Sequence, residues 1–451
     1  MSFAALNLHS AFLRAVEALG FTTPTPIQRD AIPPVLAGRD VVACAMTGSG
    51  KTAAFLLPIA QRLMDKPRGA VRALVIAPTR ELAAQIEADL RDLARFTPVK
   101  GAAVFGGVGM GPQESAFRRG VDIIVATPGR LLDHMQHSYV RLDALEVLVL
   151  DEADRMLDMG FLPDIRRILG KLPKQRQTLL FSATMPAPIA ALAREFLRNP
   201  VPINQERQAA PATGITHSVY AVSQDLKGGL LTALLQREDM RSVLVFTRTK
   251  HRANRLADQL ARRGISTDRI HGNRSQAQRT HALEGFKRGK YRVLVATDIA
   301  ARGIDIDELS HVVNFDVPNV ADDYIHRAGR TARAGAVGEA ITFVAPDEMG
   351  DLKAIERAVG NPLPRLKLEG FDYSQRPAER LEIPLAERVA AIRAQKSAER
   401  ARARDKASRQ GQAPTQAPGQ VRGQGHGRPA TRSGQGARGR GYWAGISGRN
   451  R

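Results

Sequence analysis

The chain has 451 residues, of which 43% are hydrophobic and 25% charged, a globular composition that is too long for one core of ordinary size. No apolar run reaches the roughly 18 residues that cross a bilayer, and the N-terminus lacks the pattern of a signal peptide. Cys44 is the single cysteine, so no internal disulfide forms and a reducing, cytoplasmic setting is expected. We expect Cys44 to be a small buried strand residue rather than a reactive thiol.

The net charge of +21 indicates a polyanionic partner, because such an excess attracts nucleic acid. Its distribution is uneven. Residues 401–451 hold ten Arg and one Lys against one Asp, a net +10, which leaves +11 for the first 400 residues. We therefore expect this tail to supply much of the long-range attraction.

Short runs rich in Val, Ile and Leu alternate with helix-like stretches in the first half of the chain. Such runs are typical of strands buried on both faces, and their alternation with helices predicts a parallel α/β sheet. The expected strands are 41–45, 73–77, 102–105, 122–126, 147–150 and 178–181.

A polar, proline-containing stretch at 199–213 interrupts this pattern and indicates a linker. A second series of strands then begins, which predicts a second α/β domain. Its expected strands are 218–222, 243–246, 293–296, 312–315 and 340–344. Beyond residue 370 the strands stop. A charged, Ala-rich helical extension (371–409) and a disordered basic tail (410–451) are expected there.

A glycine-rich loop follows the first strand and precedes a helical stretch, which is the context of a phosphate-binding P-loop. Gly48 and Gly50 allow backbone N–H groups to surround phosphates at a helix N-terminus. Lys51 is expected against the β and γ phosphates, with the Thr52 hydroxyl on Mg²⁺. The loop departs from the general pattern at its first position, which is Ala45 rather than Gly. The expected nucleotide-binding set is Ala45, Met46, Thr47, Gly48, Ser49, Gly50, Lys51 and Thr52.

The strand 147–150 ends in two carboxylates, Asp151 and Glu152. A P-loop enzyme needs an acid at the end of a neighbouring buried strand to hold its metal, and Asp151 fits that role. Glu152 is expected to orient and deprotonate the attacking water. Alone, the pair could be acids favoured at a helix N-terminus. The P-loop about one hundred residues upstream favours ATP hydrolysis.

With these motifs the sequence resembles the DEAD-box RNA helicase family, from about Phe3 to about residue 370. Residues 20–28 look like the motif that reads adenine, where the Gln28 amide would pair with the base edge and an aromatic ring, Phe21 or Phe3, would stack on it. Three loops of the first domain resemble the family's RNA contacts: Pro78, Thr79, Arg80, Gly106, Gly107, Thr127, Pro128, Gly129 and Arg130. The family's coupling elements correspond to Ser182, Ala183, Thr184, Asp154 and His326.

The second domain matches the same family. Residues 245–249 resemble motif IV, and 297–305 resemble motif V, in which Gly303 and Asp305 would face the nucleotide. Arg279, Thr297 and Arg302 are expected to contact RNA. Residues 326–333 resemble motif VI, whose Arg327 and Arg330 would reach the γ-phosphate. Ala328 and Ala332 differ from the residues usual at these positions of motif VI, but the charged residues of the motif are unchanged.

The resemblance implies an α/β protein with two RecA-like P-loop domains, parallel sheets and a basic tail. The expected limits are 1–30 for the adenine motif, 31–203 for the first domain, 204–216 for the linker, 217–370 for the second domain, 371–409 for the extension and 410–451 for the tail.

The implied function is an RNA helicase that binds ATP and Mg²⁺ and opens short duplexes when its domains close on RNA. RNA would be held through its backbone, independently of base sequence. The core is expected to be monomeric and free of membrane contacts, with ribosomal precursors or RNA-decay proteins as candidate partners. Ribosome assembly, RNA decay and cold adaptation are all compatible. The wording of residues 246–251 is most similar to the bacterial RhlE-type subgroup.

Two other functions remain open at the level of the sequence. A DNA-directed helicase shares the two domains, and comparing RNA with DNA stimulation separates it from an RNA helicase. An ATP-gated RNA clamp with little unwinding is the other, and strand displacement separates the two. The tail, with Arg-Gly pairs before Tyr442 and Trp443, suits phosphate and base contacts, although a merely solubilising tail has the same composition.

Overall fold

The computed structural model describes residues 2–45, 48–204, 214–301, 309–331 and 337–375. The chain divides into two compact units, 1–382 and 383–451, and the second lies outside the described residues. The predicted extension beyond residue 375 and the tail therefore lie outside them as well. No helix in the described ranges has the length and apolar character needed to cross a membrane.

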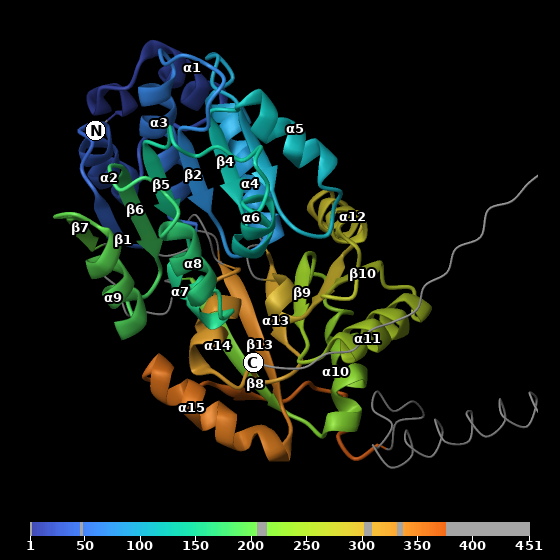
Figure 1. The fold of residues 1–451 in the computed structure, drawn as a ribbon. Coiled ribbons are helices and arrows are strands. Elements are labelled where there is room, and N and C mark those ends of the chain that lie inside the picture. The colour runs from blue at the N-terminus through green and yellow to red at the C-terminus, as the bar shows by residue number, and fades with distance from the viewer. Residues whose placement is uncertain (1, 46–47, 205–213, 302–308, 332–336, 376–451) are drawn as a thin grey trace, which may run out of the picture. The chain divides into compact units, whose positions relative to one another are not determined.

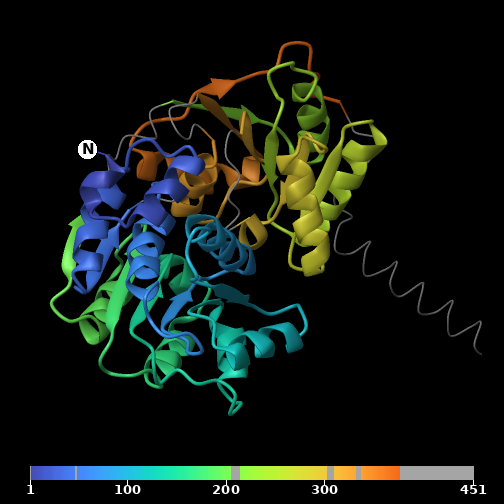
Figure 2. The same cartoon turned by 90° about the horizontal axis from the view of Figure 1, so that it is seen from above.

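The first domain contains a seven-stranded parallel sheet in the order β3-β4-β2-β5-β6-β1-β7, with helices on both faces (Figures 1 and 2). Its strands are β1 Val41–Cys44, β2 Ala73–Ile76, β3 Gly101–Val104, β4 Ile123–Ala126, β5 Val147–Leu150, β6 Gln177–Ser182 and β7 Val201–Asn204. Its helices are α1 Ser10–Ala18, α2 Pro26–Leu36, α3 Lys51–Leu63, α4 Arg80–Leu93, α5 Gly111–Arg119, α6 Pro128–His134, α7 Ala153–Asp158, α8 Leu162–Leu169 and α9 Ala187–Phe196, and a 3-10 helix spans Phe3–Leu6.

The second domain repeats this plan with the strand order β10-β11-β9-β12-β13-β8-β14. Its strands are β8 Ile215–Ala221, β9 Val243–Phe246, β10 Thr267–Ile270, β11 Val293–Ala296, β12 His311–Asn314, β13 Gly338–Val344 and β14 Arg365–Leu366. Its helices are α10 Lys227–Leu234, α11 Lys250–Arg262, α12 Gln276–Lys287, α13 Asp298–Ala301, α14 Ala321–Ala328 and α15 Met349–Val359, with 3-10 turns at Gln224–Leu226 and Pro346–Glu348.

Each sheet is covered by apolar side chains on both faces, as the continuous apolar runs predict. In β5, Val147 and Val149 join one core cluster and Leu148 and Leu150 the other, because successive strand residues point to opposite faces. The strand β9 divides its residues between two clusters in the same way. The predicted parallel α/β architecture is confirmed.

Three edge strands differ from the prediction. The stretch 199–213 was predicted as a linker, but Val201–Asn204 forms β7, which pairs with β1. Pro202 is compatible with this position because an edge strand leaves N–H groups unused. The expected linker 204–216 overlaps both neighbouring strands: Asn204 is the last residue of β7, and Ile215 and Thr216 are the first two residues of β8. Residues 205–213 lie outside the described ranges. The polar β10 and the two-residue β14 also lack the apolar runs that predict strands.

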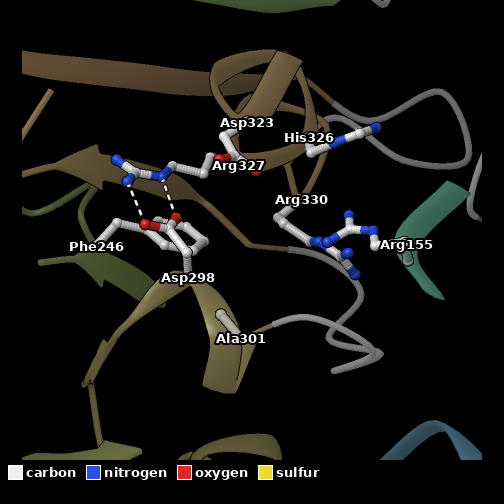
Figure 3. A pocket seen from close by; sticks show the side chains of 8 residues that line it. All are labelled: Arg155, Phe246, Asp298, Ala301, Asp323, His326, Arg327 and Arg330. Carbon is white, nitrogen blue, oxygen red and sulfur yellow. Dashed lines mark hydrogen bonds and ion pairs between the residues drawn. The ribbon is translucent and has the colours of Figure 1, made fainter. Parts of the chain in front are cut away.

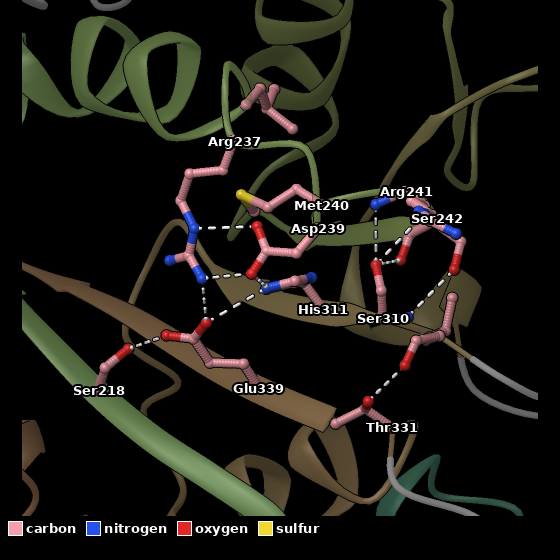
Figure 4. A network of polar contacts seen from close by, with 12 residues as sticks. Ser218, Arg237, Asp239, Met240, Arg241, Ser242, Ser310, His311, Thr331 and Glu339 are labelled. Carbon is pink, nitrogen blue, oxygen red and sulfur yellow. Dashed lines mark hydrogen bonds and ion pairs between the residues drawn. The ribbon is translucent and has the colours of Figure 1, made fainter. Parts of the chain in front are cut away.

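A polar network joins the amino ends of β12 and β13 (Figure 4). His311 Nε2 lies 3.2 Å from Glu339 Oε2 and 3.8 Å from Asp239 Oδ2. These three residues offer potential metal-ligand atoms within 4.8 Å of one another. The Arg237 guanidinium, however, lies 2.6 Å from Asp239 and 3.0 Å from Glu339. Since Arg237 supplies the positive charge, the network is a structural ion-pair cluster.

Candidate active site

The P-loop joins β1 to α3. Gly48 and Gly50 have φ values of +80° and +90°, a left-handed conformation that glycine adopts without strain. A Cβ atom on Gly50 would lie 2.5 Å from Gln28 Nε2, so the loop also requires glycine for space. Lys51 is buried, and its Nζ donates to the Ala45 carbonyl at 3.1 Å across the loop. Thr52 follows on α3, while Met46 and Thr47 lie outside the described residues.

The predicted adenine motif lies against this loop. The buried Gln28 side chain donates from Nε2 to the Gly50 carbonyl at 3.1 Å, and its Oε1 accepts from the Thr25 N–H at 3.0 Å. Gln28 thus links the adenine motif to the P-loop through the chain's own hydrogen bonds. Phe21 is 44% exposed and open to a stacking partner, whereas Phe3 is 5% exposed and packs in the core.

The two carboxylates follow β5 beside the P-loop. Burial raises the pKa of Asp151 to about 6, with Lys51 opposing this and Glu152 adding to it. Glu152 has a φ of +49°, an uncommon conformation for a residue other than glycine. Its Oε2 is buried without a hydrogen-bond partner, and the nearest cation, Arg155 Nε, is 3.9 Å away. Two buried acids with this little compensation form a site that can take a cation and a polar ligand.

The fourth acid of the motif faces a different partner. Asp154 Oδ2 accepts hydrogen bonds from the Thr184 N–H at 2.8 Å and from Thr184 Oγ1 at 3.0 Å. The Asp154 N–H donates to Ser182 Oγ at 3.1 Å. The Ala183 carbonyl accepts from the half-buried Cys44 thiol at 3.3 Å. Of the predicted coupling residues, Asp154 is therefore in direct contact with Ser182 and Thr184. Cys44 is in a strand but less buried than expected.

His326 and Arg327 of motif VI lie on α14 and line a small, open pocket together with Arg330, which follows that helix (Figure 3). Arg327 forms a bidentate pair with Asp298, at 2.6 Å from Nε to Oδ1 and 2.7 Å from Nη2 to Oδ2. Its Nη1 donates to Asn314 Oδ1 at 3.1 Å and to the Asp316 carbonyl at 2.8 Å. Arg327 is thus held by groups of the second domain.

Arg330 and His326 line the same pocket, together with Arg155 of the first domain. Arg330 is buried. Burial lowers the pKa of His326 to about 4, and the positive charge of Arg155 adds to this effect. His326 is therefore neutral at pH 7 and presents an uncharged imidazole beside two arginines.

The predicted RNA contacts of the first domain gather at the carboxyl ends of β2, β3 and β4. The Arg80 guanidinium lies against Gly106 and Gly107, where a Cβ atom on Gly107 would collide with it. Arg130 Nη1 donates to the Val108 carbonyl at 3.1 Å. Pro78 is buried, and Thr79 is the N-cap of α4, where its hydroxyl accepts a hydrogen bond from the Leu82 N–H at 3.2 Å. Thr127 is the N-cap of α6, and Pro128 and Gly129 are the first residues of that helix.

In the second domain, Arg279 and Thr297 lie near the start of α12 and of α13. Arg279 Nη2 is 3.0 Å from Glu81 Oε2, and Gln276 Nε2 donates to Glu81 Oε1 at 3.0 Å. Arg279 thus pairs with an acid next to Arg80. The predicted Arg302, Gly303 and Asp305 lie outside the described residues.

The sequence did not single out the partners of several predicted residues. Asp298 lies within motif V and Glu81 directly follows Arg80, but only the fold shows that they pair with Arg327 and Arg279. Asn314 and Gln113 lie outside every motif, and no local signal marks them. Arg155 directly follows the acidic motif and reaches the pocket of His326.

The chain matches two protein-family models, the DEAD/DEAH box helicase family over residues 25–192 and the helicase conserved C-terminal domain over 227–335. It is 42% identical over 392 residues to the DEAD-box ATP-dependent RNA helicase CshA of Bacillus subtilis, covering 86% of this chain and 79% of that protein. CshA of Geobacillus kaustophilus is also 42% identical, over 85% of this chain and 82% of that protein.

Solved structures show the same likeness. The structure of S. cerevisiae Dbp5 bound to RNA and ADP BeF3 superposes with a TM-score of 0.73 and 32% identity, over 81% of this chain and 95% of that one. Mss116p bound to ssRNA and AMP-PNP gives a TM-score of 0.74 and 29% identity, over 82% of this chain and 80% of that one. With two RecA-like sheets, a P-loop and adjoining carboxylates, the chain belongs to the DEAD-box family of ATP-dependent RNA helicases.

Proposed function

We propose that this chain hydrolyses ATP at the P-loop and uses the change in nucleotide state to open short RNA duplexes. The buried Glu152 carboxylate beside Asp151 and Lys51 carries this proposal, because its Oε2 has no hydrogen-bond partner among the described residues and lies 3.9 Å from Arg155 Nε. A glutamate that makes no ion pair as short as a hydrogen bond keeps an oxygen available to accept a proton from water. Gln28 and Phe21 would recognise adenine, and Lys51 would hold the β and γ phosphates.

The residues at the loop fit Mg²⁺. Asp151 offers a carboxylate whose pKa burial raises, and Thr52 offers a hydroxyl at the start of α3. Both are oxygen ligands of the kind Mg²⁺ takes. The ion, bound with ATP, would neutralise phosphate charge. The chain's own part is to hold Asp151 at the end of β5 and Thr52 on α3.

The two arginines of motif VI are proposed to stabilise charge on the γ-phosphate in different ways. Arg330 lines the pocket next to Arg155 and would supply the direct contact. Arg327, predicted as a second direct contact, is bound to Asp298 and would act by fixing α14. Arginine fingers are worth roughly 10³–10⁵ in rate in related phosphoryl transfers.

RNA would bind across Arg80, the Gly106–Gly107 loop, the start of α6 and Arg279, through backbone contacts that tolerate any base sequence. RNA held by both domains would favour the arrangement in which Arg330 meets the nucleotide, and Asp154 with Thr184 would connect the two events. The RhlE-type subgroup, a cytoplasmic location and a role in ribosome assembly, RNA decay or cold adaptation stay proposals from the sequence. The relatives compared above carry the name CshA.

The test is ATP turnover and strand displacement by Glu152→Gln, with and without RNA. We expect turnover to fall by about 10²–10⁴ while RNA and ATP still bind, because the amide keeps the shape of the side chain. Glu146→Gln is the matched control: Glu146 lies just before the amino end of β5 and pairs with Arg72 at 2.9 Å. Wild-type turnover in Glu152→Gln would contradict the assignment. Turnover without strand displacement in the wild type would favour an RNA clamp, and stimulation by DNA in place of RNA would favour a DNA helicase.

A further inference from the structure

A buried glutamine is hydrogen-bonded to one of the loops of the first domain that are proposed to contact RNA. Gln113 lies on α5 and is 6% exposed. Its Nε2 donates two hydrogen bonds, to the Phe105 carbonyl at 3.1 Å and to the Gly109 carbonyl at 3.3 Å. Its Oε1 lies 3.2 Å from Nε2 of His134, the last residue of α6. One side chain therefore connects the Gly106–Gly107 loop with the helix that carries Thr127 and Arg130.

The direction of each hydrogen bond follows from the two carbonyls. Because Phe105 and Gly109 can only accept, the Gln113 amide must turn its NH₂ group toward them and its oxygen toward His134. His134 must then carry its proton on Nε2, which leaves Nδ1 to accept from the Tyr139 hydroxyl at 2.8 Å. Burial lowers the pKa of His134, and nearby Arg130 adds to this. The neutral tautomer that this network requires is thus the stable form.

The two carbonyls held by Gln113 bracket the loop that receives Arg80. Gly107 has a φ of +83°, and a side chain at Gly107 would collide with the Arg80 guanidinium. Within the same loop, the Val108 carbonyl accepts from Arg130. The distance between Phe105 and Gly109 therefore sets the shape of the surface on which Arg80 rests.

We propose that Gln113 is a positioning residue for RNA, and that His134 fixes the orientation of its amide. Among the described residues, its side-chain hydrogen bonds go to Phe105, Gly109 and His134, which lie outside the P-loop, so we expect it to act on RNA binding and to leave ATP binding alone. The inference rests on the proposed function, since it assumes that Arg80 and the glycine loop contact RNA. The alternative is a purely structural buried glutamine, which would affect stability and nothing else.

The experiment replaces Gln113 by Met, which fills a similar volume without hydrogen bonds, and by Glu, which keeps the shape but cannot donate. We expect the RNA concentration for half-maximal ATPase to rise roughly tenfold in both, as the loss of two hydrogen bonds to carbonyls implies. The KM for ATP and the RNA-free ATPase rate should stay within about twofold. His134→Phe keeps both carbonyl bonds, and we expect a smaller rise of roughly threefold.

Gln259→Met is the matched control, because Gln259 is also buried, 5% exposed, on α11 of the second domain. It should leave the half-maximal RNA concentration unchanged, because Gln259 lies in the second domain and away from the Gly106–Gly107 loop. Equal RNA values for Gln113→Met and Gln259→Met would overturn the proposal, as would a parallel rise in the KM for ATP. If the Gln113 variants do not fold, His134→Phe decides, and a wild-type RNA value in it refutes the proposal. Wild-type protein that RNA fails to stimulate defeats the proposed function instead, so the two failures are distinguishable.

Discussion

The pairing of Arg327 with Asp298 allows the two arginines of motif VI to be told apart by substitution. Arg327 is 3% exposed and makes four hydrogen bonds with Asp298, Asn314 and Asp316. Breaking a buried ion pair costs roughly 3–5 kcal/mol, and an exposed pair less than about 1 kcal/mol. Since the Asp298 side chain is 27% exposed, we expect removal of its charge to cost an intermediate free energy of about 2 kcal/mol.

The perturbation is Asp298→Asn, which keeps one acceptor and places an NH₂ group against the guanidinium. If Arg327 acts by fixing α14, this change should lower the melting temperature and reduce RNA-saturated single-turnover ATPase by roughly 30-fold, the equivalent of about 2 kcal/mol. Arg330→Ala should reduce the same rate by about 10³. If Arg327 instead leaves Asp298 to reach the phosphate, Asp298→Asn would free it. Wild-type or faster turnover in Asp298→Asn would refute the bracing role.

Three further predictions concern stability and RNA affinity. Lys227 is fully buried, and its Nζ lies 2.5 Å from Glu348 Oε2. Lys227→Met should therefore lower the free energy of unfolding measured in urea by about 2–4 kcal/mol, and adding Glu348→Gln should restore part of this loss. Additive losses in the double variant would contradict the pairing. His326 has its pKa lowered to about 4 in the folded chain, so the unfolded chain binds more protons between pH 6.5 and 4. The neutral His326 therefore contributes fully to the free energy of unfolding above pH 6.5, and this contribution is lost as the pH falls toward 4, by no more than about 3 kcal/mol. His326→Gln should flatten this part of the stability profile, and an unchanged profile would contradict the low pKa. Deleting residues 401–451, which lie outside the described ranges, should weaken RNA binding and its salt dependence while RNA-saturated ATPase survives; an unchanged salt slope counts against a direct role.

The sequence predicted the inner strands because burial on both faces leaves a continuous apolar run, as in β5 and β9, and it also predicted the edge strand β3, which contains no charged residue or proline. It did not predict β7, β10 and β14, whose residues are polar or include proline. An edge strand has one sheet neighbour and more contact with water, so its sequence is less constrained. Their strand identity depends on the neighbour that pairs with them.

The same distinction separates the predictable from the unpredictable part of the site. The P-loop and its carboxylates could be recognised because each function sits within a few consecutive residues at the end of one strand. Asp298 is 29 residues from Arg327 and His134 is 21 residues from Gln113, so each pair meets only when strands and helices pack. Exposure could not be foreseen either: Phe3 and Phe21 are both aromatic residues of the adenine motif, yet packing buries only Phe3.

The acidic motif shows how four consecutive residues come to serve two partners. Along an uninterrupted strand, side chains two positions apart would share one face. The left-handed φ of Glu152 ends β5 and starts α7, so the chain turns between Asp151 and Asp154. Asp151 is consequently left beside Lys51, while Asp154 is carried round to Thr184. Residues held in this conformation cost of order 1–3 kcal/mol and persist where the surroundings fix them. The strained turn at Glu152 therefore separates the carboxylate proposed to hold the metal, Asp151, from the proposed coupling residue Asp154, three positions along the chain.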